Sequence, residues 1–83
     1  MGQTEFKYGI SEHQAIFVAS CIETAASAEG ISPTEMYERM QRVNLIDDYI
    51  LACYDVLHAE SRQNVTQDIL KTLKIWERKK SKL

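Results

Sequence analysis

The chain is poor in the side chains that most often bind metals or act as nucleophiles, with two cysteines and two histidines among 83 residues. The four residues are Cys21, Cys53, His13 and His58. They lack the spacing of a zinc site, since there is no C-x-x-C motif and His13 and Cys21 would lie about 12 Å apart along one helix. We expect two reduced, buried thiols rather than a disulfide or redox pair, and no metal or cofactor.

Long apolar runs are also absent. No stretch approaches the roughly 18 residues that a membrane-spanning helix needs, and residues 1–8 lack the apolar core of a signal peptide. The myristoylation pattern requires Ser or Thr at the sixth position, which Phe6 occupies. We therefore expect a cytoplasmic protein without membrane attachment.

Catalytic motifs are missing as well. The chain has no glycine-rich phosphate loop and no histidines paired at metal-binding spacing. With 83 residues, 45% hydrophobic and 27% charged, it can build one small core but spares little surface for a deep pocket. The composition predicts a single folded domain that binds another molecule rather than an enzyme, and no catalytic residue is assigned.

Helix-capping residues divide the rest of the chain into segments. Ser11, with Gln14 three residues later, predicts the start of a helix over 12–29. Gly30 supplies the left-handed residue that ends helices. The first helix is therefore expected to stop one residue before Gly30.

A second helix begins almost at once. Ser32, Pro33 and Glu35 combine an N-cap, a proline at the first helical position and a capping-box acid. Asn44 is expected to end this helix, because asparagine tolerates the left-handed conformation. Its apolar positions are Met36, Tyr37, Met40 and Val43. The stripe formed by Met36, Tyr37 and Met40 is interpreted as core rather than as a cofactor contact.

Apolar residues at spacings of three and four continue from Leu45 and predict a third helix to about His58. Ser61 or Asn64 then caps a fourth helix, with Trp76 as a core anchor. The pattern predicts an all-α single domain, either a compact four-helix bundle or an orthogonal helical array. Its expected parts are a flexible N-terminal arm at 1–10, a helical domain at 11–78 and a basic C-terminal tail at 79–83.

Charge is distributed unevenly. From Lys71 onward there are six basic residues and one acidic residue, whereas the preceding seventy residues carry four basic and eleven acidic side chains. An acidic body therefore carries a basic last helix. This basic end is interpreted as a solvated helix end or, alternatively, as a surface that contacts an acidic partner or nucleic acid. The residues that would make such a contact are Lys71, Lys74, Arg78, Lys79 and Lys80.

Nucleic acid is the less favoured partner. The second and third helices are joined by a tight turn, as in a helix-turn-helix motif, but the first turn of the third helix carries Asp47 and Asp48. DNA phosphates would repel these carboxylates, because recognition helices contact DNA with their first residues.

The densest cluster of versatile side chains is Tyr54, Asp55 and His58. On one helix, spacings of three and four let Tyr54 and Asp55 both approach the imidazole. In one interpretation His58 caps the third helix by hydrogen-bonding a terminal carbonyl, and in another the exposed part of the three side chains binds a partner. Catalysis is disfavoured, because Cys53 points to a different face and Ser61 has no oxyanion-hole motif nearby.

Several segments in order resemble a known family. They are Phe17-Val18, Cys21-Ile22-Glu23, Ile31-Ser32, Met36-Tyr37-Glu38, Asp48-Tyr49-Ile50 and the stretch from Tyr54 to His58. Together they resemble the domain of unknown function 3791, found in short bacterial proteins. The chain departs from the family pattern at Ala59-Glu60-Ser61, where Thr-Gln and then Gly or Ser are usual, and at Asn44, where Gly is usual.

The resemblance implies a small helical bacterial protein without an assigned biochemical role. Members are often encoded beside proteins that resemble ADP-ribosyltransferase toxins, which implies a toxin of this kind as the partner and an antitoxin role by association. We expect a non-enzymatic protein–protein interaction module, antitoxin-like or an accessory subunit of a neighbouring enzyme. The alternatives are a nucleic-acid-associated regulator that uses the basic last helix and a self-associating structural protein.

Overall fold

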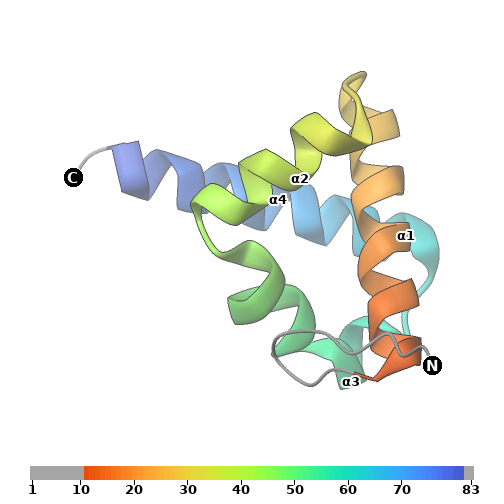
Figure 1. The fold of residues 1–83 in the computed structure, drawn as a ribbon. Helices are drawn as coiled ribbons and strands as arrows, with labels where there is room; N and C mark the ends of the chain where they lie inside the picture. Colours follow the sequence, from red (N-terminus) through yellow and green to blue (C-terminus); the bar gives the residue numbers. More distant parts are fainter. Residues whose placement is uncertain (1–10, 82–83) are drawn as a thin grey trace, which may run out of the picture.

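The structure, a computed structural model, describes residues 11–81. Within this range the chain forms helices and no strand, and the prediction of an all-α single domain is confirmed (Figure 1). The predicted arm at 1–10 and residues 82–83 of the predicted tail lie outside the described residues. The helices are α1 (Glu12–Glu29), α2 (Pro33–Arg42), the π-helix η1 (Ile46–Leu51), α3 (Tyr54–Leu57) and α4 (Arg62–Ser81).

Both ends of α1 form as the capping residues predict. Ser11 Oγ accepts a hydrogen bond from the Gln14 amide at 3.1 Å, and the Ser11 amide donates to Gln14 Oε1 at 3.0 Å. Gly30 adopts the left-handed conformation with φ of 70°, and the Ile31 amide donates to the Ala26 carbonyl at 3.0 Å. These bonds satisfy terminal groups that have no partner within the helix.

The second helix begins with one of the two bonds of a capping box, since Ser32 Oγ accepts from the Glu35 amide at 3.1 Å. It ends at Arg42, and Asn44 follows in the left-handed region with φ of 57°, as predicted. Its apolar stripe is only partly core. Met36 and Met40 are fully buried, but the prediction was wrong for Tyr37, which remains 45% exposed.

The predicted third helix was wrong as one continuous element. The chain forms the π-helix η1 and then leaves the helical conformation at Cys53 (φ −108°, ψ 21°) before α3 begins. Of the two apolar residues at the end of α3, Leu57 is 2% exposed and Val56 is 62% exposed. Adjacent side chains point in different directions on a helix, so only Leu57 reaches the core.

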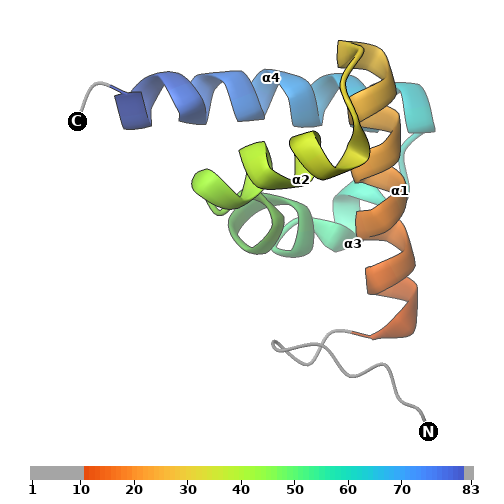
Figure 2. The same cartoon turned by 45° about the horizontal axis from the view of Figure 1, so that its top comes forward.

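Ser61 caps the last helix, since its Oγ accepts from the Asn64 amide at 3.3 Å. Helix α4 continues through Lys79 and Lys80 to Ser81. It therefore passes position 78, where the sequence predicts the helical domain to end, and the start of the predicted tail is helical. In Figures 1 and 2 its basic end extends beyond α2.

Helix α1 packs against both α2 and α4 and also touches η1. Figure 2 shows α4 running across α1 rather than alongside it, so of the two predicted arrangements the structure forms the orthogonal helical array and not the compact four-helix bundle. Trp76, expected as a core anchor, is partly buried, packs against the core and meets Tyr49 edge-to-face with ring centroids 6.2 Å apart. The buried hydrophobic residues are Val18, Cys21, Ala25, Ala26, Met36, Met40, Leu45, Ile46, Ile50, Leu57, Val65, Ile69 and Leu73.

Both cysteines are free thiols; the predicted burial is confirmed for Cys21, whereas Cys53 is only partly buried. In the described part of the chain, no helix combines the length and the apolar character that crossing a membrane requires.

Candidate functional site

Three rings from two helices form a series that we call the aromatic ladder: Phe17 on α1, Tyr54 on α3 and His58 just after it. Phe17 meets Tyr54 edge-to-face, with ring centroids 5.4 Å apart and planes at 82°. Tyr54 and His58 stack almost parallel, with centroids 4.5 Å apart and planes at 6°. The spacing of four residues predicts this stacking, but only the fold brings Phe17 to the other two rings.

His58 also caps α3. Its Nδ1 lies 2.8 Å from the Tyr54 carbonyl oxygen. A carbonyl only accepts hydrogen bonds, so Nδ1 carries the proton, and in the neutral ring Nε2 is left as an acceptor. The hydrogen bond that the capping interpretation predicts is therefore present.

Asp55 does not join this arrangement. It is exposed, and no ion pair between Asp55 and His58 occurs among residues 11–81. His58 Nδ1 is already bonded to the Tyr54 carbonyl. The Asp–His pair on which a nucleophilic triad depends therefore does not form.

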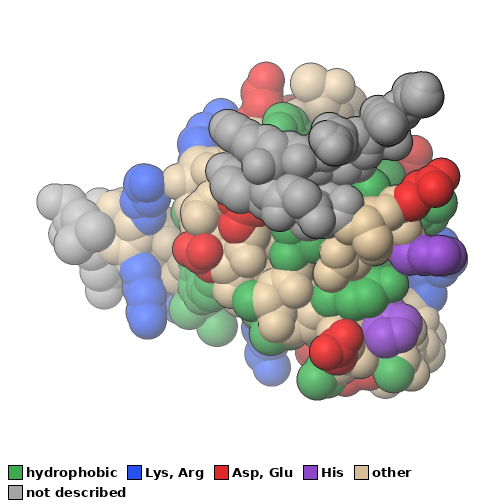
Figure 3. Space-filling model, turned by 60° about the horizontal axis from the view of Figure 1, so that its bottom comes forward, with side chains coloured by type: hydrophobic (Ala, Val, Ile, Leu, Met, Phe, Trp, Pro, Cys, Tyr) green, Lys and Arg blue, Asp and Glu red, His purple; other side chains and the backbone are tan. Residues whose placement is uncertain are grey.

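Two large apolar side chains that neighbour ladder residues in the sequence are exposed. Ile16, which precedes Phe17 on α1, and Val56, which lies between Tyr54 and His58 in the chain, are each 62% exposed. Figure 3 looks onto the side of α3 and the start of α1, where hydrophobic side chains lie beside the histidines. The Phe17–Tyr54 contact holds the two helices together at this point.

A half-open pocket of about 240 Å³ adjoins the ladder and shares Phe17 and His58 with it. Its walls come from α1, from the connection after α3 and from the first turns of α4. We call it the Arg62 pocket, and its lining residues are Phe17, Ser20, Cys21, Thr24, His58, Glu60, Arg62, Val65 and Thr66.

Polar side chains of α1 and α4 meet across this pocket. Arg62 Nη1 donates to Ser20 Oγ at 3.3 Å, and the Thr24 and Thr66 hydroxyl oxygens lie 3.0 Å apart. Sequence reasoning missed all four residues as site candidates. The only signal is that Ser20 and Thr24, like Arg62 and Thr66, are four residues apart and so share one side of their helix.

Cys21 forms part of the pocket floor but is a poor nucleophile. Burial raises the pKa of its thiol to about 12, while the positive charge of Arg62 opposes that effect. The thiolate is the reactive form of cysteine, so at neutral pH Cys21 is almost entirely in the unreactive form.

The residues of the predicted basic end do not act as one free cluster. Lys74 Nζ lies 3.3 Å from a carboxylate oxygen of Glu29, and Lys80 Nζ donates to the Arg42 carbonyl at 2.9 Å. The remaining members are exposed and make no ion pair with another described side chain. They are Lys71, Arg78 and Lys79.

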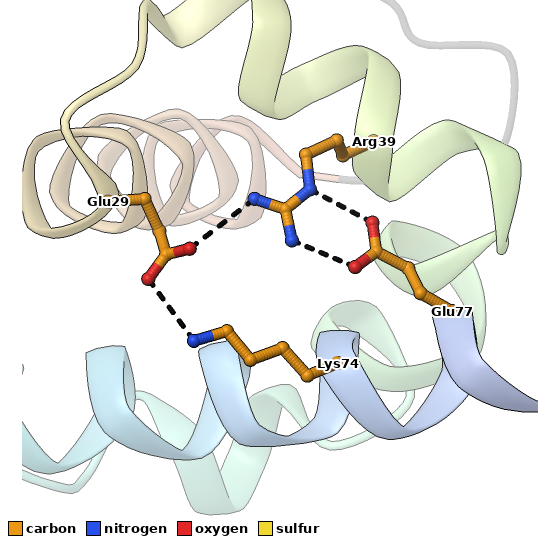
Figure 4. Close-up of polar contacts among 4 residues, drawn as sticks. All are labelled: Glu29, Arg39, Lys74 and Glu77. Atoms are coloured by element: carbon orange, nitrogen blue, oxygen red, sulfur yellow. Dashed lines mark hydrogen bonds and ion pairs between the residues drawn. The ribbon is translucent and has the colours of Figure 1, made fainter.

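A charge network ties α4 to α1 and α2 (Figure 4). Arg39 donates two hydrogen bonds to Glu77, at 2.9 and 2.8 Å, and its Nη1 lies 3.5 Å from Glu29. The bonds from Arg39 hold the pKa of Glu77 below its ordinary value, and the bonds to Glu77 raise the pKa of Arg39. Lys74 extends the network from the other side of Glu29.

No group of three or more His, Cys, Asp and Glu side chains that could hold a metal ion lies within the described range, 11–81. The fold and the site thus describe a small all-α protein with an exposed aromatic and apolar surface beside a polar pocket.

The family follows from the sequence match. The model of the family described as "Protein of unknown function (DUF3791)" matches residues 16–76, most of the chain, and the chain belongs to this family. The resemblance seen in the sequence is thereby confirmed. No curated protein and no solved structure matches the chain significantly.

Proposed function

We propose that this protein is a non-enzymatic protein–protein interaction module whose binding surface is centred on the aromatic ladder. The observation that carries the proposal is the exposure of Ile16 and Val56, each 62%, on two helices joined by the Phe17–Tyr54 contact. Aromatic residues are enriched in protein interfaces, and apolar side chains at a binding surface gain free energy when a partner excludes water from them.

Rigidity supports the same proposal. Phe17 and Tyr54 are partly buried and packed against each other, and His58 is held by both its stack and its hydrogen bond. Side chains that are already ordered lose less conformational entropy when a partner binds. The partner-binding residues predicted from sequence, Tyr54, Asp55 and His58, all belong to this surface or border it.

The finer proposal concerns the kind of partner. The family resemblance supports an antitoxin-like protein, or an accessory subunit of a neighbouring enzyme, with an ADP-ribosyltransferase-like toxin as the candidate partner. This role requires only that the module cover a surface of that enzyme.

Affinity capture from the lysate of the source cells tests the proposal. The tagged protein is expected to retain one stoichiometric protein that survives nuclease treatment. Val56→Asp should abolish retention without lowering the melting temperature, because Val56 is largely exposed. Gln41→Asp on α2, also exposed, is the matched control and should retain the partner; equal retention by both variants would contradict the proposed surface.

A second candidate function is association with nucleic acid through the end of α4. The supporting observation is that exposed Arg78 and Lys79 lie in the last turn of α4, and this end of the helix extends beyond α2 (Figure 1). Recovery of nucleic acid alone, lost on Lys79→Glu and steeply dependent on salt, would favour this candidate. A mass in solution that rises with protein concentration would instead favour self-association.

A further inference from the structure

The guanidinium group of Arg62 lines the Arg62 pocket and has few hydrogen-bond acceptors within the protein. Arginine has five N–H donors, and the one side-chain acceptor found for Arg62 is Ser20 Oγ at 3.3 Å. No carboxylate within residues 11–81 lies in ion-pair distance of it. Arg39 differs from Arg62 in this respect, because it forms ion pairs with both Glu77 and Glu29.

The charge of Arg62 is directed across the pocket toward α1. Its bond to Ser20 joins the first turn of α4 to the middle of α1. Its field also reaches the buried Cys21 thiol, where it partly opposes the rise in pKa that burial causes. Glu60 and Arg62 both line the pocket and are both exposed, and Arg62 is bonded to Ser20 rather than to Glu60.

The remaining walls suit a short acidic side chain. The Ser20 hydroxyl accepts from Arg62 and keeps its own hydrogen to donate to a carboxylate, whereas the Thr24 and Thr66 hydroxyls already donate within the protein. Phe17 and Val65 offer apolar contacts for a methylene stem. Hydrogen bonds to a charged acceptor are stronger than neutral ones, and arginine matches the planar geometry of a carboxylate. The volume of about 240 Å³ admits one side chain rather than a large ligand.

We propose that the Arg62 pocket receives the carboxylate of an Asp or Glu side chain of the protein partner. This inference rests on the interaction function proposed above and adds the chemistry of its anchor. Phe17 and His58 belong to both the aromatic ladder and the pocket, so a chain that crosses the ladder passes the pocket mouth. Arg62 then fixes the position of the partner segment relative to the aromatic ladder.

The test uses a matched pair of small probes, N-acetyl-aspartate amide and N-acetyl-asparagine amide, which have nearly the same shape and differ in charge. Each is titrated into the ¹⁵N-labelled full chain, and the amide resonances of Ser20, Thr24 and Thr66 are followed. The aspartate probe should produce saturable shifts and the asparagine probe should bind at least about tenfold more weakly, a difference of roughly 1.4 kcal/mol.

Variants identify the group responsible. Arg62→Gln should reduce binding of the aspartate probe about tenfold, and Arg62→Lys should retain part of it because the charge remains. Arg78→Gln removes an exposed arginine outside the pocket and should leave binding unchanged. Melting curves of all three variants establish that each is folded. Equal binding of both probes, equal binding by wild type and Arg62→Gln, or tighter binding of acetate than of the aspartate probe would each overturn the proposal.

The experiments distinguish a failure of the pocket proposal from a failure of the proposed interaction function. A partner captured equally by wild type and Arg62→Gln, but lost on Val56→Asp, overturns the pocket proposal and leaves the interaction module intact. Saturable binding of the aspartate probe with no protein captured overturns the interaction function instead.

Discussion

Arg39 on α2 and Glu77 on α4, 38 residues apart in the chain, are joined by two parallel hydrogen bonds of 2.9 and 2.8 Å. The side chains are partly shielded, with 22% and 31% of their surface exposed. This bidentate pair holds the last helix against the second helix (Figure 4), and α4 continues beyond α2 (Figure 1).

Breaking this pair should lower the free energy of unfolding. For Glu77→Gln we expect a loss of about 1 kcal/mol, near the upper end for exposed ion pairs, because the geometry is bidentate and partly shielded. In a domain of this size that loss corresponds to a fall in melting temperature of about 4–8 °C. Glu38→Gln, which removes an exposed carboxylate from α2, is the control and should change little. Equal melting temperatures for the two variants would contradict a stabilising role for the pair.

The same pair predicts a dependence on pH. Arg39 holds the pKa of folded Glu77 below its ordinary value of 4.5, so protons bind more readily to the unfolded chain. The stabilisation is fully present above about pH 4.5 and is lost as pH falls through the folded-state pKa. The difference in unfolding free energy between wild type and Glu77→Gln should therefore shrink between pH 7 and pH 3, as followed by urea unfolding. A constant difference would show that Glu77 does not titrate with a lowered pKa.

His58→Ala should destabilise the fold by about 1 kcal/mol. The change removes the hydrogen bond from Nδ1 to the Tyr54 carbonyl and the stack on the Tyr54 ring. His13→Ala, an exposed histidine in the first turn of α1, is the control and should stay within about 0.5 kcal/mol of wild type. Unchanged melting of His58→Ala together with lost partner binding would show that the imidazole serves binding rather than capping.

The two thiols should differ in reactivity toward an alkylating reagent. Cys21 is 3% exposed and burial raises its pKa to about 12, whereas Cys53 is only partly buried. In native protein at pH 8, Cys53→Ser, which leaves Cys21, should react more slowly than Cys21→Ser, which leaves Cys53. The rates should converge in urea, where both thiols are exposed. Equal native rates would mean that the region around Cys21 opens readily.

Helix boundaries were predictable where capping residues act locally. Ser11, Gly30 and Asn44 each perform the role that their side chain or backbone freedom predicts. The number of helices was less predictable, because apolar spacing between Leu45 and His58 does not distinguish one helix from a π-helix followed by a short α-helix. In the structure Ile46 and Ile50 of η1 and Leu57 of α3 belong to the same core on either side of that break.

The candidate site was predictable only in part. Tyr54 and His58 are neighbours along the chain, so their stacking follows from helical spacing. Phe17 and Arg62 are brought to them by long-range packing, and no local pattern reports which side chains meet across α1 and α4.

By itself, then, the sequence determined the all-α class, most helix ends, the acidic body with a basic last helix, and the family. These properties depend on composition, on capping chemistry within four residues and on the order of short motifs. Only the tertiary structure decided the exposure of Tyr37 and Val56, the pairing of Arg39 with Glu77 and the pocket around Arg62. Each of these depends on how helices distant in sequence cross, because the crossing determines which side chains lose contact with water.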